Sequence, residues 1–338
     1  MRRKIAIGIG IALLVLVFIG GGIGLYISSL LEAPVHQGEE PLKLYITKQD
    51  TPSAIADRLN ANSALRYLLE SEDRYRVRTG FYAIPNGESS LDVFRRLRSG
   101  NQTPVKLVIK EARTMDRIAG QIAKAVQLDS AEIAECLYNP DFCEEYGYTV
   151  ETMPALFIPN TYHCYWDVTL SQLMERLKRE NDNFWTAERD MKASLLNMTH
   201  NEVSTLASIV ESETANNAEK PRVAGLYLNR LRLHMKLQAD PTVIFAVGDF
   251  SIRRVLNEHL RTESPYNTYL HEGLPPGPIR IPSIDGLDAV LNAEQHSYLY
   301  MCAKEDFSGT HNFATSWTEH IANARRYQRA LSERGIQK

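Results

Sequence analysis

The chain has 338 residues, of which 44% are hydrophobic and 23% are charged, a composition typical of folded globular proteins and a length sufficient for two domains. The formal net charge is -3, and nothing in the sequence supplies the basic stripe that nucleic-acid binding requires. The nine histidines lack H-E-x-x-H spacing and no Gly-rich phosphate loop is present, so we expect neither a metal ion nor a cofactor.

The first segment predicts a membrane span. Residues 5–27 (IAIGIGIALLVLVFIGGGIGLYI) carry no charge, and about 23 residues are enough to cross a hydrocarbon core as a helix. A cleaved signal peptide is the alternative, but its apolar core is shorter, at about 7–15 residues, and ends in a small-x-small site that the following SSLLEAPVHQGEEP lacks. Arg2, Arg3 and Lys4 precede the span, and the positive-inside rule places them in the cytoplasm. We expect residues 1–32 to form a single-pass anchor in the bilayer of the inner (plasma) membrane, with the rest of the chain extracytoplasmic or periplasmic.

A short polar linker is expected from Ala33 to Glu40, and a weak internal repeat follows it. Each repeat has an alternating strand, a polar turn, a Ser or Thr N-cap and a helix with apolar residues at i, i+4 and i+8. The three copies begin at Leu42, Tyr82 and Val105, and their N-caps would be Thr51, Ser89 and Thr114. Such β-turn-α units cannot bury their apolar faces alone, so we expect them to pack as one small α+β domain over residues 33–129. The pattern resembles LysM modules, which bind glycans rich in N-acetylglucosamine, although β-turn-α units also recur in many other folds.

Residues 130–338 predict a larger, helix-rich α+β domain, which would be the catalytic one. It is loop-rich from Ala239 to Asp285 and ends in a helix that the capping box Ser316–Glu319 begins. Cys136 and Cys143 bracket a turn-like segment and either form a disulfide outside the cell or remain free buried thiols. The predicted fold class is therefore α+β, with a transmembrane helix, a small LysM-like domain and a larger helix-rich domain.

The segment TLASIVESETANNAEK, residues 205–220, carries two neighbouring carboxylates on one helix. The helix begins at a capping box of Thr199 and Glu202, and the sequence places an apolar stripe along it at Val203, Leu206, Ala207 and Val210. The stripe continues to Glu213 and Thr214, whereas Glu211 lies about 200° round the helix from Glu213. The two carboxylates therefore cannot share a face, and only Glu213 is directed toward the apolar side.

A carboxyl group at the edge of an apolar face has a raised pKa and can remain protonated near neutral pH. That property suits a general acid that protonates the leaving oxygen of a glycosidic bond. The alternative is that Glu213 is a solvated residue in the last turn, since the helix breaks at ANNAEKP.

Six motifs in order resemble the YceG-like family of endolytic murein (peptidoglycan) transglycosylases. They are IVESET, the NRL helix, QADPT, YNTY, GLPPGPI and the late HNF, and the resemblance extends from the anchor to the C-terminus. It implies cleavage of the β-1,4 bond between N-acetylmuramic acid and N-acetylglucosamine without water, leaving 1,6-anhydro ends. It also implies that Glu213 protonates the glycosidic oxygen and then, as a carboxylate, helps to deprotonate the sugar's C6 hydroxyl. One group serving both steps needs no second carboxylate.

Further residues are candidates for substrate binding or for supporting the site. Gln238 and Asp240 could bind sugar hydroxyls or amides, although Asp240 could instead cap the turn before Pro241. The YNTY loop offers aromatic faces and hydrogen-bonding groups suited to an N-acetylated sugar, with a merely packed loop as the alternative. Its residues are Tyr266, Asn267, Thr268 and Tyr269, and the other candidates are Glu211, Thr214, Thr161 and Tyr162, with His311 and Phe313 able to close a cleft. Asn160 stands where the family often has an aspartate, so we assign it no catalytic role.

The leading interpretation is thus a membrane-anchored lytic transglycosylase that terminates or trims nascent glycan strands. Its partners would be peptidoglycan strands and, as candidates, peptidoglycan synthases. Two alternatives are a non-catalytic glycan-binding scaffold of a cell-wall synthesis complex and a muramidase that uses water, with Asp240 as a partner of Glu213.

Overall fold

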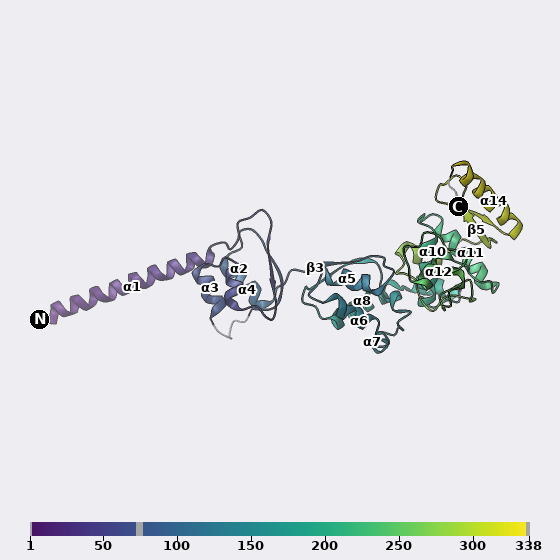
Figure 1. The fold of residues 1–338 in the computed structure, drawn as a ribbon. Helices are drawn as coiled ribbons and strands as arrows, with labels where there is room; N and C mark the ends of the chain where they lie inside the picture. The colour runs from purple at the N-terminus through teal and green to yellow at the C-terminus, as the bar shows by residue number, and fades with distance from the viewer. Residues whose placement is uncertain (1, 72–76, 336–338) are drawn as a thin grey trace. The chain divides into compact units, whose positions relative to one another are not determined.

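The computed structural model describes residues 2–71 and 77–335, which form two compact units. Unit 1 contains Met1–Lys106 and His163–Val168, and unit 2 contains Leu107–Tyr162 and Thr169–Lys338. Helices predominate and the strands form small two-stranded sheets, so the predicted helix-rich α+β class is confirmed (Figure 1).

Unit 1 begins with the long apolar helix α1 (Arg2–Glu32). Its segment Leu13–Glu32 has 20 residues with a mean hydropathy of 2.2, enough to cross a membrane by length and composition. A signal sequence meets the same criterion, so the anchor remains a proposal.

The rest of unit 1 is a two-stranded antiparallel sheet with three helices. Strand β1 pairs with β2 so that Leu44 faces Tyr82. The elements are β1 (Leu42–Ile46), α2 (Pro52–Arg58), α3 (Ser63–Glu70), β2 (Gly80–Ile84) and α4 (Ser90–Ser99). Ile55, Leu65 and Leu97 from the three helices are buried against the sheet and form the core of this unit.

The predicted N-caps of the three β-turn-α units are confirmed. The side-chain oxygens of Thr51, Ser89 and Thr114 each accept a hydrogen bond from the backbone N–H three residues later. The third β-turn-α copy, β3 (Val105–Ile109) and α5 (Met115–Ala123), does not share one core with the first two. Residues Leu107–Tyr162 belong to unit 2, and β3 pairs with β4 (Asn160–Cys164). A small domain that ends at residue 129 therefore remains a prediction, whereas the compact units divide at Lys106.

The segment predicted to be a short polar linker, Ala33 to Glu40, is hydrogen-bonded to the rest of unit 1. Ala33 O accepts bonds from the backbone N–H and the hydroxyl of Ser90, at 2.9 and 3.0 Å. Val35 N donates to Glu88 O, and Asn62 Nδ2 reaches back to Leu30 O at 2.7 Å. These backbone groups are therefore paired with the rest of the unit, and a linker over these residues remains a prediction.

Unit 2 consists mainly of helices. Its early part contains α6 (Ser130–Leu137), α7 (Pro140–Glu145), a 3-10 turn (Met153–Leu156), α8 (Leu170–Phe184) and α9 (Ala187–Leu195). Its later part contains α10 (His200–Glu213), α11 (Lys220–Arg232), α12 (Asp240–Val247), a 3-10 turn (His259–Arg261), α13 (Ile284–Leu291), β5 (Tyr300–Ala303), β6 (His311–Ala314) and α14 (Trp317–Glu333). Cys136, Cys143 and Cys302 are free thiols, and Cys143 is buried.

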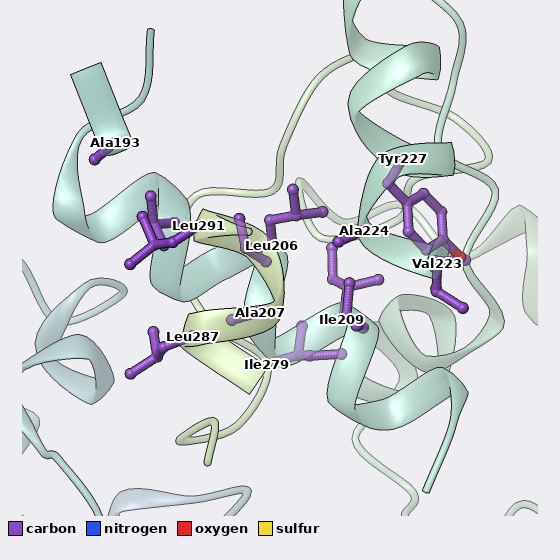
Figure 2. Close-up of a cluster of buried hydrophobic side chains, with 14 of the residues drawn as sticks. Ala193, Leu206, Ala207, Ile209, Val223, Ala224, Tyr227, Ile279, Leu287 and Leu291 are labelled. Atoms are coloured by element: carbon purple, nitrogen blue, oxygen red, sulfur yellow. The ribbon is translucent and has the colours of Figure 1, made fainter. Parts of the chain in front are cut away.

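Helix α10 is the central helix of the core of unit 2. Figure 2 shows Leu206, Ala207 and Ile209 from α10 packed with side chains of α11 and α13. The predicted stripe of Val203, Leu206, Ala207 and Val210 is buried, and the residues between them are buried as well, so this part of the helix is covered on all sides. Ser and Thr are tolerated here because their hydroxyls bond to backbone carbonyls, as Ser208 Oγ does to Thr205 O at 2.7 Å.

The helix starts follow the predicted capping signals with one difference. The reciprocal box of Thr199 and Glu202 at the start of α10 is confirmed. At the start of α14, Ser316 caps Glu319 N as predicted, but the Glu319 carboxylate binds Thr315 N at 3.0 Å rather than Ser316 N. The helix begins where expected, with its first turn held by two preceding residues.

Candidate active site

Glu213 is the last residue of α10, and the backbone changes direction immediately after it. Thr214 is extended (φ -139°, ψ 135°) and its hydroxyl accepts a hydrogen bond from Asn216 N at 3.1 Å. Thr214 is therefore the C-cap rather than the next position of a stripe, and its side chain is buried in the turn. Glu213 lies at the negative end of the helix dipole, which disfavours a second negative charge on its carboxyl group.

The carboxyl group of Glu213 is held by Tyr227 of α11. The Tyr227 hydroxyl donates a hydrogen bond to Glu213 Oε1 at 2.8 Å, and the Tyr227 side chain is 2% exposed. Burial and the neighbouring Glu213 raise the pKa of Tyr227 well above its usual range, so it remains a donor throughout the accessible pH range. In Figure 2 Tyr227 stands beside Val223 at one side of the core cluster.

The pKa of Glu213 is raised to about 7, and burial is the main cause. The negative charge of Asp240 raises it further, while the Tyr227 hydrogen bond and the positive charges of His311 and Arg230 oppose the rise. A pKa near neutral pH suits a group that donates a proton and later accepts one.

Asp240, the first residue of α12, is paired with Tyr269. The Tyr269 hydroxyl donates to Asp240 Oδ1 at 2.6 Å, and burial together with Asp240 raises the pKa of Tyr269. Asp240 does not cap its own helix, because the N-cap is Ala239 and no side chain bonds to the first turn. Its exposed carboxylate is therefore available beside Glu213, as the sugar-binding interpretation expects.

Arg230 connects the segment before α12 to Leu299, the residue that precedes β5. Its buried guanidinium donates to Leu237 O at 2.9 Å and to Leu299 O at 2.6 Å, and approaches Gln238 Oε1 at 3.3 Å. Gln238 has φ +50°, a left-handed conformation that is uncommon outside glycine. The backbone N–H of Gln238 donates a hydrogen bond to Thr268 O at 3.1 Å. This bond and the contacts of Arg230 together hold the strained Gln238 and, two residues later, Asp240.

The YNTY loop is largely a packed scaffold. Asn267 is fully buried and donates to Leu260 O and Thr262 O at 3.0 and 2.9 Å. Thr268 Oγ1 accepts from Ala239 N at 3.0 Å and so fixes the start of α12. Tyr266 packs on Phe245 with ring centroids 4.6 Å apart, which leaves Tyr269 as the loop residue paired with Asp240.

Glu211 forms a buried ion pair away from Tyr227. Lys220 Nζ lies 2.8 Å from both carboxylate oxygens, and Ser283 Oγ donates to Oε2 at 2.5 Å. The side chains of Glu211 and Lys220 are 10% and 3% exposed. The two glutamates have different partners, as the helix geometry predicts, but the Glu211 side chain is also only 10% exposed, which was not expected.

Thr161 and Tyr162 are not among the contacts of the Glu213 group in the part of the chain that is described. Thr161 is exposed on β4, and the Tyr162 hydroxyl donates to Ile158 O at 2.5 Å. Burial raises the pKa of Tyr162 to about 12, and its charged neighbours are Glu180 and Arg176 of α8. The prediction that the two residues serve the site has no support from this placement.

Sequence reasoning missed Tyr227, Arg230 and Glu219. The signal was present, because Glu219, Val223, Tyr227 and Arg230 recur at helical spacing on one face of α11. Polar residues on the face of a helix that is expected to be buried indicate a buried polar network. In the structure Tyr227 and Arg230 of this face act on Glu213.

Comparison with known proteins agrees with these motifs. A model of the YceG-like family matches residues 44–326. An endolytic murein transglycosylase of Bacillus subtilis is 28% identical over 93% of this chain and 92% of its own length. One from Streptococcus pneumoniae is 26% identical over 73% of this chain, which spans half of that relative's length. The crystal structure of a YceG-like protein from Listeria monocytogenes, 26% identical, covers 84% of this chain and 99% of its own, with a TM-score of 0.57. The chain belongs to the YceG-like family.

Proposed function

We propose that this protein is an endolytic peptidoglycan lytic transglycosylase with Glu213 as its catalytic residue. The observation that carries the proposal is the raised pKa of Glu213, about 7, in a carboxyl group that Tyr227 orients. The family's relatives with the name endolytic murein transglycosylase support the same substrate.

The reaction follows from the two protonation states of Glu213. The neutral carboxyl group protonates the glycosidic oxygen that leaves C1 of N-acetylmuramic acid. The resulting carboxylate helps to remove the proton from the C6 hydroxyl of the same sugar, whose oxygen closes onto C1 as a 1,6-anhydro ring. No water enters, and no second carboxylate is needed at the spacings of hydrolases.

The test is digestion of purified peptidoglycan by the full-length protein in detergent, with mass analysis of the products. We expect 1,6-anhydro ends from the wild-type protein and none from Glu213→Gln. Glu294→Gln, which removes a surface ion pair with Arg222, is the matched control and should retain activity. Hydrated reducing ends would instead identify a water-using muramidase, and binding without products would identify a scaffold.

The location is part of the same proposal. The side chains from Leu13 to Ile27 of α1 are apolar or glycine apart from Tyr26, and the large ones are exposed, as lipid contact requires. With Arg2, Arg3 and Lys4 on the cytoplasmic side, the catalytic unit would act outside the membrane on nascent strands. Protease treatment of intact spheroplasts should degrade the folded units and spare the N-terminal tip, and the reverse pattern would contradict this topology.

A further inference from the structure

His311, whose charge affects the pKa of Glu213, is itself bound by a carboxylate, that of Glu219. Glu219, 7% exposed at the start of α11, accepts two hydrogen bonds of 2.8 Å, one from the backbone N–H of His311 and one from its Nδ1. An ionised carboxylate can only accept, so Nδ1 carries the proton. In the neutral ring Nε2 is then the acceptor, and the bond to Glu219 fixes this tautomer.

The two groups are held by one face of one helix. Glu219 and Tyr227 are two turns apart on α11, with Val223 between them, and their Cα atoms are separated by about 12 Å along the helix axis. Helical side chains lean toward the N-terminus, which directs the Tyr227 hydroxyl toward the Glu219 end. Glu213 is bound by Tyr227 and His311 by Glu219, and His311 lowers the pKa of Glu213 only when its ring is protonated and positively charged.

Within the described part of the chain, hydrogen bonds engage one carboxyl oxygen of Glu213 and one ring nitrogen of His311. Tyr227 occupies Oε1 of Glu213, which leaves Oε2 to carry the transferable proton. If Glu213 acted alone, this one oxygen would have to give up a proton to one substrate atom and accept a proton from another. Nε2 of His311, opposite the nitrogen that Glu219 engages, provides a separate acceptor.

We propose that His311 is a second catalytic residue whose Nε2 accepts the proton of the C6 hydroxyl while Glu213 protonates the leaving oxygen. This proposal rests on the proposed function and moves the deprotonation of the C6 hydroxyl from the Glu213 carboxylate to His311. The C1–O4 bond breaks and O4 takes the proton of Glu213, while the O6–H bond breaks toward Nε2 and O6 bonds to C1. The products are a 1,6-anhydro end and a free 4-hydroxyl, with an imidazolium at His311 and a carboxylate at Glu213. Proton transfer through solvent then restores both groups, and nothing is oxidised or reduced.

Asparagine and alanine separate the chemical role of His311 from its structural one. In His311→Asn the amide nitrogen takes the place of Nδ1 and keeps the bond to Glu219, but nothing replaces Nε2. We expect kcat on peptidoglycan to fall by about 10²–10⁴-fold with KM and the melting temperature little changed. The matched control is His200→Asn, which alters another histidine–carboxylate pair, His200 Nε2 to Asp190 at 2.8 Å, at the opposite end of α10. It should retain the wild-type kcat.

Chemical rescue supplies a readout that a structural histidine would not affect. Added imidazole should restore part of the kcat of His311→Ala, because it can occupy the vacated space and accept the proton. Wild-type kcat in His311→Asn, or a loss in His311→Ala that imidazole leaves unchanged, would overturn the role of His311 alone. Failure of the wild-type protein itself to form anhydro ends would overturn the proposed function, and this inference with it.

Discussion

The pairing of Tyr227 with Glu213 makes a prediction about the pH dependence of catalysis. Tyr227→Phe removes a hydrogen bond that stabilises the carboxylate, so the pKa of Glu213 should rise above about 7. Hydrogen bonds to charged groups contribute about 1.5–3 kcal/mol, which corresponds to an upward pKa shift of about one to two units. The alkaline limb of kcat against pH should move up accordingly. Tyr148→Phe, which removes a hydroxyl that meets Asn181 at 3.3 Å, is the control, and a limb that stays in place would refute the pairing.

The raised pKa of Glu213 also predicts a pH-dependent cost to stability. The folded-state pKa of about 7 exceeds the ordinary 4.5, so the folded protein binds this proton more tightly than the unfolded chain. The stabilisation of the folded protein by the protonated Glu213 is fully present below about pH 4.5 and is lost as the pH rises through 7. Glu213→Gln should therefore exceed the wild type in free energy of unfolding by about 1–3 kcal/mol at pH 8, and by little at pH 4. Urea unfolding at both values measures this, and a difference independent of pH would contradict it.

At the scale of single residues, the sequence could identify Glu213 but not its environment. The helical angle between Glu211 and Glu213 depends only on local geometry and could be predicted. The partners that tune Glu213 lie 14 or more residues away, on α11, α12 and β6, and come together only in the tertiary fold. The burial of Glu211 was missed for the same reason, since its cover is Lys220 and Ser283.

Among the elements, the Glu211–Lys220 pair links the end of α10, the start of α11 and the N-cap of α13. Breaking it by Glu211→Gln leaves Lys220, 3% exposed, without a charge partner and should cost about 3–5 kcal/mol of stability. The double variant Glu211→Gln/Lys220→Met should cost less than the sum of the single variants, as chemical denaturation would show. Activity per folded molecule should remain far above that of Glu213→Gln, and equal losses would refute the separation of the two glutamates.

Helix starts were predictable and the packing of the units was not. Thr51, Ser89 and Thr114 cap their helices because a side-chain oxygen satisfies an N–H that is free in any helix. Which strand each copy pairs with is a long-range matter, and β3 pairs with β4 from more than 50 residues away rather than with the first sheet. The repeat pattern therefore predicted the local conformation of each copy correctly, but it did not predict which strands pair.

For the whole molecule, the segment between α1 and β1 predicts where the chain can be shortened. A protein that begins at Ser29 keeps Leu30 O for Asn62 and Ala33 O for Ser90. One that begins at Leu42 loses these bonds and those of Val35 and His36, a loss on the order of 2–5 kcal/mol. We expect the first to be soluble with unit 1 folded, and the second to show a lower melting temperature for this unit. Equal melting temperatures would mean that the segment is a passive connection.

The same docked segment limits how far unit 1 could travel from a membrane. A protein on a flexible tether can explore the wall at many depths, whereas one whose anchor helix continues directly into a bonded segment keeps a fixed height and orientation. On the proposed anchoring, unit 1 would slide in the plane of the bilayer and remain in the thin layer beside it.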